Sequence, residues 1–370
     1  TNSQQTIPFP CFIHVAKVIL LWLLLQFNAQ MLANNPLGPE VEDRIMDGIE
    51  FTILNKFDEA EKIYRELTTQ YPEEPMGYFY LAAVIQSEML DREDYSRQAE
   101  FEGMIKTCID KSVNLQKKRK GDPYLLFYEA SAYLYRSFMQ SKQGKWWPAY
   151  RSASRGANRL TKVLKADSSF YDAFLGIGSF KYWKSSKTKF VRWIPFIPDE
   201  REKGIRMVKK AVEKGAYVRF IARDQLAWIL LDAGRTGEAL QCARENYRLY
   251  PQSRFFRWTL VNIYDKAGDM ENAYNLYQKL LVELRAMPEN NHYNEIGCLL
   301  RMAEIDFARG NIAGANTLAT EIMSLKLDSN IRKRARNKLK KALKLKKECE
   351  KALSHAVPQT GKTVLQNDDG

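Results

Sequence analysis

The sequence predicts an all-α fold, a right-handed solenoid of about seven stacked helical hairpins. Apolar residues recur with the period of an α-helix through most of the chain, and no strand-like alternation competes with them. The phrases around Ala239 and Ala273 resemble each other at a spacing of 34 residues, which is typical of repeat architectures. Glycine or asparagine also precedes alanine by five residues at Asn55/Ala60, Gly144/Ala149, Gly234/Ala239, Gly268/Ala273 and Gly310/Ala315.

Each of these pairs is expected to mark the corner between the two helices of a hairpin. The glycine, or Asn55 in the first pair, ends a helix in a left-handed conformation that costs most residues free energy. The alanine lies where the two helices touch, because a small side chain lets them approach closely. A single hairpin cannot bury its apolar face alone, so such hairpins stack in a row.

Three segments carry a fuller set of repeat positions. The first is segment 41–74, which matches at Gly48, Phe51, Ala60, Tyr64 and Pro72. The second is segment 220–253, with Leu226, Ala227, Ala239 and Pro251, and the third is segment 254–287, with Leu260, Tyr264, Ala273 and Tyr277. On these positions the chain resembles tetratricopeptide-repeat proteins over roughly residues 40–325. We assign residues 34–327 to this solenoid, with insertions near 86–98 and 184–198. The resemblance implies a fold and not a particular task.

Residues 1–33 are expected to form a signal peptide or an N-terminal anchor. Lys17 precedes the apolar run Val18–Leu25, and small and polar residues follow. The run is too short to cross a bilayer, so we expect an exported protein, periplasmic or extracellular. The alternative is a retained anchor over residues 12–32. With this leader the chain also looks like exported bacterial tetratricopeptide proteins, a resemblance that implies no activity.

The net charge of +13 is concentrated near the C-terminus. Residues Lys326 to Lys351 hold twelve Lys or Arg and three Asp or Glu, so the body of the chain is close to neutral. Apolar residues at helical spacing predict a basic amphipathic helix over residues 328–354. We favour a helix that caps the last hairpin, and binding to anionic lipid is the alternative. Residues 355–370 are expected to be disordered.

Groups suited to catalysis are sparse, so we expect no enzyme activity, no metal and no cofactor. His292 and Glu295 have the H-x-x-E spacing that places two metal ligands on one helical face. We favour a solvated or helix-capping role for them, because they lie between hairpins. The five cysteines are widely spaced and form no C-x-x-C pair, so they are expected to be free and buried.

The resemblance implies a groove lined by the first helix of each hairpin. The inward positions of this groove carry aromatic residues and lack the Lys, Asn and Arg set that binds a C-terminal carboxylate. Large aromatic residues are typical of interaction hot spots, although an inserted segment of the same chain would bury them equally well. The predicted partner-binding residues are Phe138, Phe174, Asp224, Trp228, Trp258 and Asn262.

The insertion near 184–198 combines basic and aromatic residues. We predict a basic and aromatic surface of Trp183, Lys187, Lys189, Arg192 and Trp193, which suits an anionic membrane or single-stranded nucleic acid. Export argues against nucleic acid. We favour an ordered loop whose aromatic residues pack on the solenoid while its lysines stay in water.

These patterns favour a non-enzymatic, exported scaffold that binds a protein or a peptide. The first alternative is a membrane-associated assembly factor, held by its leader or by the basic and aromatic segments. The second alternative is an enzyme or a repeat protein with a small-ligand site.

Overall fold

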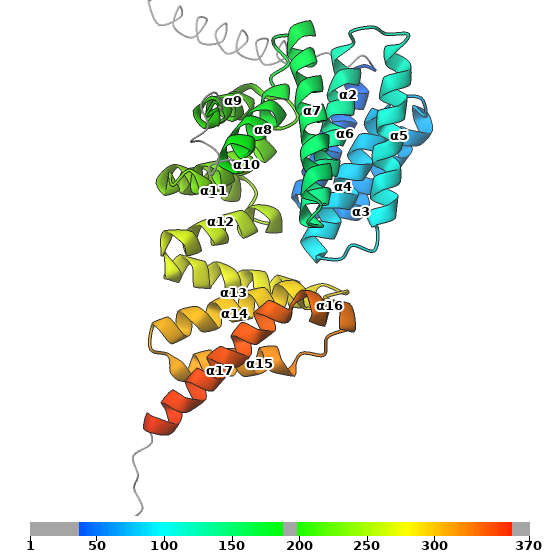
Figure 1. The fold of residues 1–370 in the computed structure, drawn as a ribbon. Coiled ribbons are helices and arrows are strands. Elements are labelled where there is room, and N and C mark those ends of the chain that lie inside the picture. Colours follow the sequence, from blue (N-terminus) through cyan, green and yellow to red (C-terminus); the bar gives the residue numbers. More distant parts are fainter. Residues whose placement is uncertain (1–36, 188–197, 357–370) are drawn as a thin grey trace, which may run out of the picture. The chain divides into compact units, whose positions relative to one another are not determined.

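The computed structural model describes residues 37–187 and 198–356, where every regular element is an α-helix (Figure 1). These residues contain the predicted seven helical hairpins, followed by two more helices. The hairpins are α2 Pro39–Ile53 with α3 Phe57–Gln70, α4 Met76–Arg92 with α5 Gln98–Gln116, α6 Pro123–Lys142 with α7 Trp146–Ala166, α8 Ala173–Lys187 with α9 Arg201–Lys214, α10 Arg219–Asp232 with α11 Thr236–Leu249, α12 Arg254–Ala267 with α13 Met270–Ala286, and α14 Tyr293–Ala308 with α15 Ile312–Ser324. The last two helices are α16 Ser329–Arg334 and α17 Arg336–Ala356.

The structure confirms the corner prediction at all five places. Each left-handed residue has a positive φ, and each alanine that follows it is buried. The φ values are 61° at Asn55, 74° at Gly144, 78° at Gly234, 77° at Gly268 and 81° at Gly310. One local rule, a left-handed stop and then a small contact residue, therefore repeats along the chain.

The described chain forms two compact units. The first contains the chain up to Glu50, Lys62–Leu81 and Met104–Gln225, and the second contains Phe51–Glu61, Ala82–Gly103 and the chain from Leu226 onward. Helices α2 to α5 and α10 contribute residues to both units.

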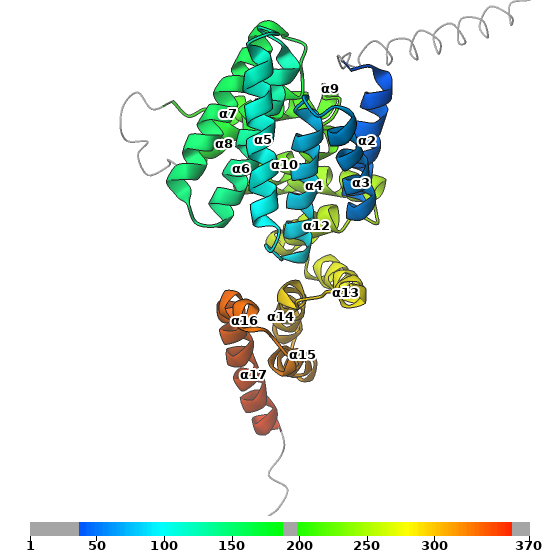
Figure 2. The ribbon, with the colours of Figure 1, turned by 90° about the vertical axis from the view of Figure 1, so that its right-hand side faces the viewer.

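Glycines allow close helix packing in the first unit, where α6 packs along α7 and α8 along α9 (Figures 1 and 2). A Cβ on Gly178 of α8 would lie 2.7 Å from the carbonyl oxygen of Gly204 on α9, and a Cβ on Gly204 would lie 2.6 Å from that of Gly178. The predicted repeat residues Gly48 and Tyr64 also meet, because a Cβ on Gly48 would overlap the Tyr64 ring. The Tyr64 hydroxyl donates to the Ile45 carbonyl at 3.2 Å.

In the second unit, α17 lies along α14 and α15 (Figures 1 and 2). Its Leu345 and Cys349 form one buried cluster with Ala303 of α14 and Ala315 of α15. The basic segment is divided at Ala335, where α16 ends and α17 begins. The apolar face of this segment packs on the last hairpin, while most of its lysines are exposed.

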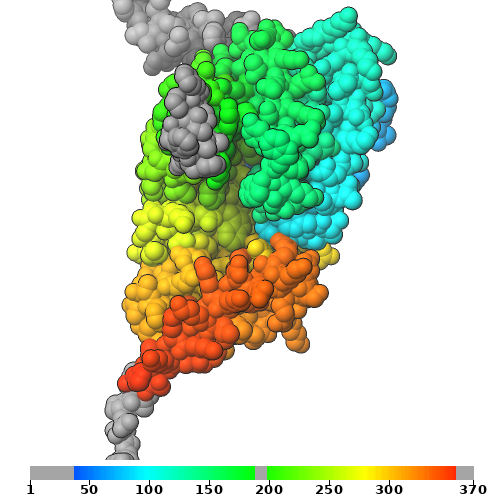
Figure 3. Space-filling view, viewed as in Figure 1, coloured from blue at the N-terminus to red at the C-terminus, as the bar shows by residue number. Residues whose placement is uncertain are grey.

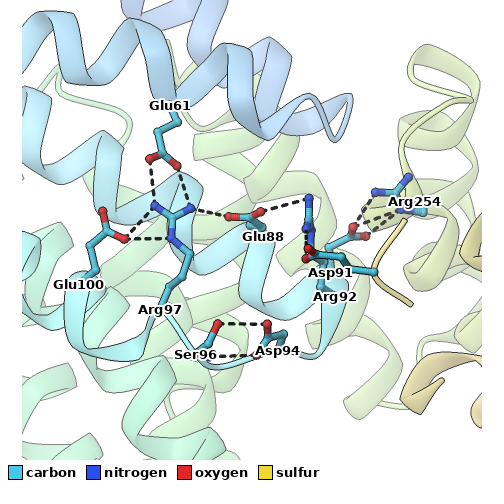
Figure 4. Close-up of polar contacts among 10 residues, drawn as sticks. Glu61, Glu88, Asp91, Arg92, Asp94, Ser96, Arg97, Glu100 and Arg254 are labelled. Atoms are coloured by element: carbon cyan, nitrogen blue, oxygen red, sulfur yellow. Dashed lines mark hydrogen bonds and ion pairs between the residues drawn. The ribbon is translucent and has the colours of Figure 1, made fainter. Parts of the chain in front are cut away.

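An arginine with three carboxylates links the α2–α3 and α4–α5 corners inside the second unit. Figure 4 shows Arg97 between Glu61, Glu88 and Glu100, at N–O distances of 2.6 to 2.9 Å. The hydrogen bonds with Glu61 are the largest cause of a raised Arg97 pKa. An insertion was expected near 86–98. Helix α4 extends through this region to Arg92, so the loop between α4 and α5 covers only residues 93–97.

The α4–α5 corner is also bound by later helices of the second unit. Arg254, the first residue of α12, forms an ion pair with Asp91 at 2.6 Å (Figure 4). Asn291 donates to the carbonyl of Arg92 at 3.0 Å, and Asn294 donates to that of Asp91 at 2.9 Å. These contacts join residues that are 163 to 203 positions apart.

Over the residues that the structure describes, no helix is both long enough and apolar enough to span a membrane.

Candidate interaction surfaces

Three of the six predicted groove residues lie in the first unit. Asp224 is buried, whereas Phe174 is half-buried and lies 5.2 Å below the Lys210 ammonium. Phe138 is 47% exposed near the end of α6. These environments differ, so a shared role for the three residues stays a prediction.

The other three groove residues lie on α10 and α12 of the second unit. The Trp228 indole Nε1 donates to the buried Thr259 hydroxyl at 3.1 Å, which fixes the ring between the two first helices. Trp258 packs edge-on against Tyr277, with ring centroids 6.5 Å apart. The Asn262 side chain donates to the Trp258 carbonyl at 2.6 Å. Both indoles are half-buried, so part of each ring remains open to solvent.

Phe255 extends this aromatic face, although it is not among the six predicted groove residues. Its ring is 42% exposed, and it lies three residues before Trp258, on the same side of α12. The helical spacing from Trp258 could have identified it. We name Trp228, Phe255 and Trp258 the groove aromatics.

A second group of exposed aromatic residues lies at the α6–α7 corner of the first unit. Trp146 is 71% exposed, Trp147 is 67% exposed and Tyr150 is 44% exposed. The Trp147 and Tyr150 rings are stacked, with centroids 5.8 Å apart. Figure 3 shows α7, in green, on the face turned toward the viewer. We define the corner surface as Phe138, Lys145, Trp146, Trp147, Tyr150 and Arg151, all of them exposed.

Aromatic residues of α6, α7 and α8 lie at the same height along these three adjacent helices. A Cβ on Gly176 of α8 would lie 2.5 Å from Leu134 of α6, so these two positions face each other. Phe138 and Phe180 each lie four residues further along these helices, which is about one turn. Tyr150 of α7 lies 6.1 Å from Phe180. The predicted groove residue Phe138 is therefore assigned to the corner surface, at the same level of the helices as Tyr150 of α7.

Cations predominate in the sequence of the helices that carry the corner surface. No Asp or Glu occurs from Ala130 to Ala166, a span that holds eight Lys or Arg, and none occurs from Ala173 to Lys187. Among the cations of these two spans, Arg159 is paired with Glu129 at 2.8 Å and Lys181 is paired with Glu200. Most of the excess charge was predicted to lie in the C-terminal segment, whereas the charge balance over short windows of sequence identifies this second basic region.

The predicted basic and aromatic surface is described only in part. Trp183 is half-buried at the end of α8, and the exposed Lys187 lies with its ammonium 5.4 Å from the Trp183 ring centroid. Lys189, Arg192 and Trp193 fall outside the described residues.

The His292–Glu295 pair is part of a helix start. His292 is the N-cap residue of α14, with a φ of 66°, and its Nδ1 lies 2.7 Å from Glu295. The buried Glu295 carboxylate also accepts hydrogen bonds from Arg285 at 2.7 Å and Asn290 at 2.8 Å. Burial raises the Glu295 pKa, but the hydrogen bonds from His292 and Arg285 outweigh burial and hold this pKa below its ordinary value. Within the described ranges, no three or more His, Cys, Asp or Glu side chains gather as metal ligands would.

No family model and no curated protein matches the chain. Among solved structures, it is similar to a tetratricopeptide protein of Thermus thermophilus (14% identity, 60% of this chain and 98% of that chain, TM-score 0.40). It is also similar to a tetratricopeptide repeat protein from Parabacteroides merdae (14%, 82% and 98%, TM-score 0.38). A third match is the Rap protein complexed with competence and sporulation factor (14%, 85% and 87%, TM-score 0.47). The seven hairpins and their repeated corners give this chain a tetratricopeptide-repeat fold.

Proposed function

We propose that this protein is a non-catalytic scaffold that binds another protein, or a peptide segment of one, through the groove aromatics of its second unit. The observation that carries the proposal is the fixed and half-exposed state of Trp228. Its indole is already held by the hydrogen bond to Thr259 on the next first helix.

A fixed tryptophan is well suited to binding. A partner that packs on it immobilises few additional side-chain torsions, so less conformational entropy is lost on association. Tryptophan is also enriched among residues that dominate binding free energy. Trp258 and Phe255 on α12 continue the same aromatic surface, which favours an apolar or aromatic segment as the ligand.

The non-catalytic part of the proposal rests on how His292 is used. Of the three histidines, His14 lies outside the described residues and His355 is exposed at the end of α17. His292 lies against Glu295, and Arg285 and Asn290 also bind this carboxylate. These contacts of His292 and Glu295 stabilise the N-terminus of α14, which is a structural role.

Site-specific photo-crosslinking tests the binding proposal. A benzophenone amino acid at position 228 or 258 should give a discrete adduct in the source cells, because each position faces the proposed ligand. The matched control is the same amino acid at Val282, which is 70% exposed on α13, a second helix. Equal adducts at all three positions, or none at 228 and 258, would contradict the proposal.

A double substitution supplies the second test. Trp228→Ala with Trp258→Ala should abolish capture of the same partner, while Val282→Ala should leave it unchanged. Circular dichroism melting of each variant separates loss of binding from loss of the fold.

Export is a further part of the proposal, and its support is the leader pattern of Lys17 followed by Val18–Leu25. A fusion of residues 1–33 to alkaline phosphatase, which is active only outside the bacterial cytoplasm, should give phosphatase activity. Replacing Leu23 and Leu24 with Asp should abolish that activity.

A further inference from the structure

We propose that the corner surface of the first unit binds an anionic lipid bilayer, with Trp146 and Trp147 inserted at the level of the headgroups. This proposal is independent of the groove aromatics, which lie in the second unit.

Two adjacent indoles of the corner surface are exposed. Trp146 and Trp147 are the first two residues of α7 and are 71% and 67% exposed. Keeping so much aromatic surface in water is unfavourable. Tryptophan prefers the interface between water and hydrocarbon, because its ring is apolar and its N–H needs a polar partner.

The comparison with other corners shows that the fold does not require this exposure. Position two after the left-handed residue is Trp146 here and Phe57 at the first corner, where the aromatic ring is only 6% exposed. The equivalent residues at the Gly234 and Gly268 corners are Thr236 and Met270. Exposed indoles are therefore particular to the α6–α7 corner among these four.

Basic side chains flank the two indoles. Lys145 and Arg151 are exposed on either side of the aromatic residues, and no acidic residue occurs from Ala130 to Ala166. Basic side chains near an anionic leaflet each strengthen binding, whereas lysine is depleted at protein–protein interfaces. Tryptophan and arginine also occur at protein–protein interfaces, but exposed lysine beside adjacent indoles, on a helix without acidic residues up to Ala166, favours acidic phospholipid.

The aromatic and basic residues at the start of α7 share one face of the helix. Trp146, Trp147, Tyr150 and Arg151 lie within the first two turns of α7, and the buried residues Ala149 and Ser152 of the same turns face the hairpin. Within the part of the chain that the structure describes, the opposite face of this short segment is exposed. It combines aromatic and basic side chains, as interfacial amphipathic helices do.

Vesicle sedimentation with the purified full-length chain tests the proposal. The protein should co-sediment with vesicles of phosphatidylcholine and phosphatidylglycerol, and much less with phosphatidylcholine alone. Trp146→Ala with Trp147→Ala should lower the partition coefficient by at least about tenfold, because apolar insertion is lost. Lys145→Glu with Arg151→Glu should lower it by at least about tenfold as well, because the attraction to acidic lipid is reversed.

Matched controls lie in the same unit. Val113→Ala removes another exposed apolar side chain, and Lys118→Glu with Lys120→Glu reverses two other exposed charges. Both controls should bind like the wild type. Since all variants share residues 1–33, any binding by that leader is common to them and cannot produce the difference.

Brominated lipids test the insertion itself. Bromine atoms near the headgroups should quench tryptophan fluorescence of the bound wild type. Trp146→Phe with Trp147→Phe should keep most of the binding and lose most of this quenching.

Several results would overturn the proposal. They are absence of binding to acidic vesicles, equal binding by the Trp146→Ala, Trp147→Ala variant, or unchanged quenching in the Phe variant. Binding to polyglutamate but not to vesicles would assign the surface to an acidic polypeptide. A dimer that the Ala substitutions dissociate, without vesicle binding, would assign it to a second copy of the chain.

Discussion

The Asn55 side chain accepts a hydrogen bond from the backbone N–H of Arg254 at 2.8 Å, across 199 positions of sequence. Asn55 is also the left-handed residue of the first corner, with a φ of 61°. Glycine would satisfy the backbone conformation alone. Asparagine satisfies it less well and supplies the acceptor that the start of α12 needs.

Substitutions at Asn55 should separate these two roles. Asn55→Ala should lower the free energy of unfolding by about 2 kcal/mol, because alanine is strained at positive φ and the acceptor is lost. Asn55→Gly should cost about 1 kcal/mol or less, because only the hydrogen bond is lost. Urea unfolding measures both. Gly234→Ala, at a φ of 78°, is the control for strain alone. Equal losses for Asn55→Ala and Asn55→Gly would show that left-handed strain contributes little.

The contact between α8 and α9 should not tolerate a methyl group. Gly204→Ala should destabilise the protein by about 1–3 kcal/mol, because its Cβ would press on a backbone carbonyl that cannot move aside. Gly103→Ala in α5, where a Cβ meets nothing within 4 Å, should instead stabilise by about 0.5–1 kcal/mol. Thermal unfolding measures both changes. If both variants were stabilised, or both destabilised, the result would contradict the close packing of α8 on α9.

The buried Glu295 should make stability depend on acid pH. Its folded pKa is below the ordinary value of 4.5, so the unfolded chain binds this proton more tightly. The stabilisation is therefore fully present above pH 4.5 and is lost as the pH falls through the lowered folded pKa.

Glu295→Gln tests this expectation. The variant should be less stable than the wild type at pH 6, and the difference should shrink as the pH falls below 4.5. The control is Glu289→Gln, since that carboxylate is 81% exposed and its pair with Arg92 is long, at 3.5 Å. If the stability difference between Glu295→Gln and the wild type did not change with pH, the ionised carboxylate would not be the cause of that difference.

Cysteine reactivity should follow burial. Burial raises the pKa of Cys298 to about 12 and also raises the pKa of Cys108, so neither forms the reactive thiolate near neutral pH. Cys242 is only half-buried. Iodoacetamide should therefore modify Cys242 in the folded protein, and Cys108 and Cys298 only after urea is added. Peptide mass spectrometry in a Cys11→Ser background measures the order, and early labelling of Cys298 would indicate local opening of α14.

The corners were predictable because each is encoded by a few neighbouring residues. A left-handed glycine and a contact alanine five positions later are a local signal, and Gly234/Ala239 and Gly268/Ala273 lie 34 residues apart. The contact between Asn55 and Arg254 was not predictable, since no local pattern links positions so distant.

The candidate surfaces were predicted less completely than the fold. Trp228 and Trp258 occupy repeat positions, so their offsets identified them. Trp146 and Trp147 lie at the corner predicted from Gly144 and Ala149, but the sequence does not distinguish an exposed aromatic residue from a buried one there. Phe57 occupies the equivalent position of the α2–α3 corner and is buried, whereas Trp146 is exposed.

The packing of α17 has a consequence for growth of the array. Leu345 and Cys349 occupy the apolar side of the last hairpin, against Ala303 and Ala315, on which another hairpin would otherwise stack. We therefore expect this helix to keep copies of the protein from joining end to end at this side. A chain that stops at Ser324 would leave this side uncovered, and its tendency to form fibres would then rise steeply with concentration.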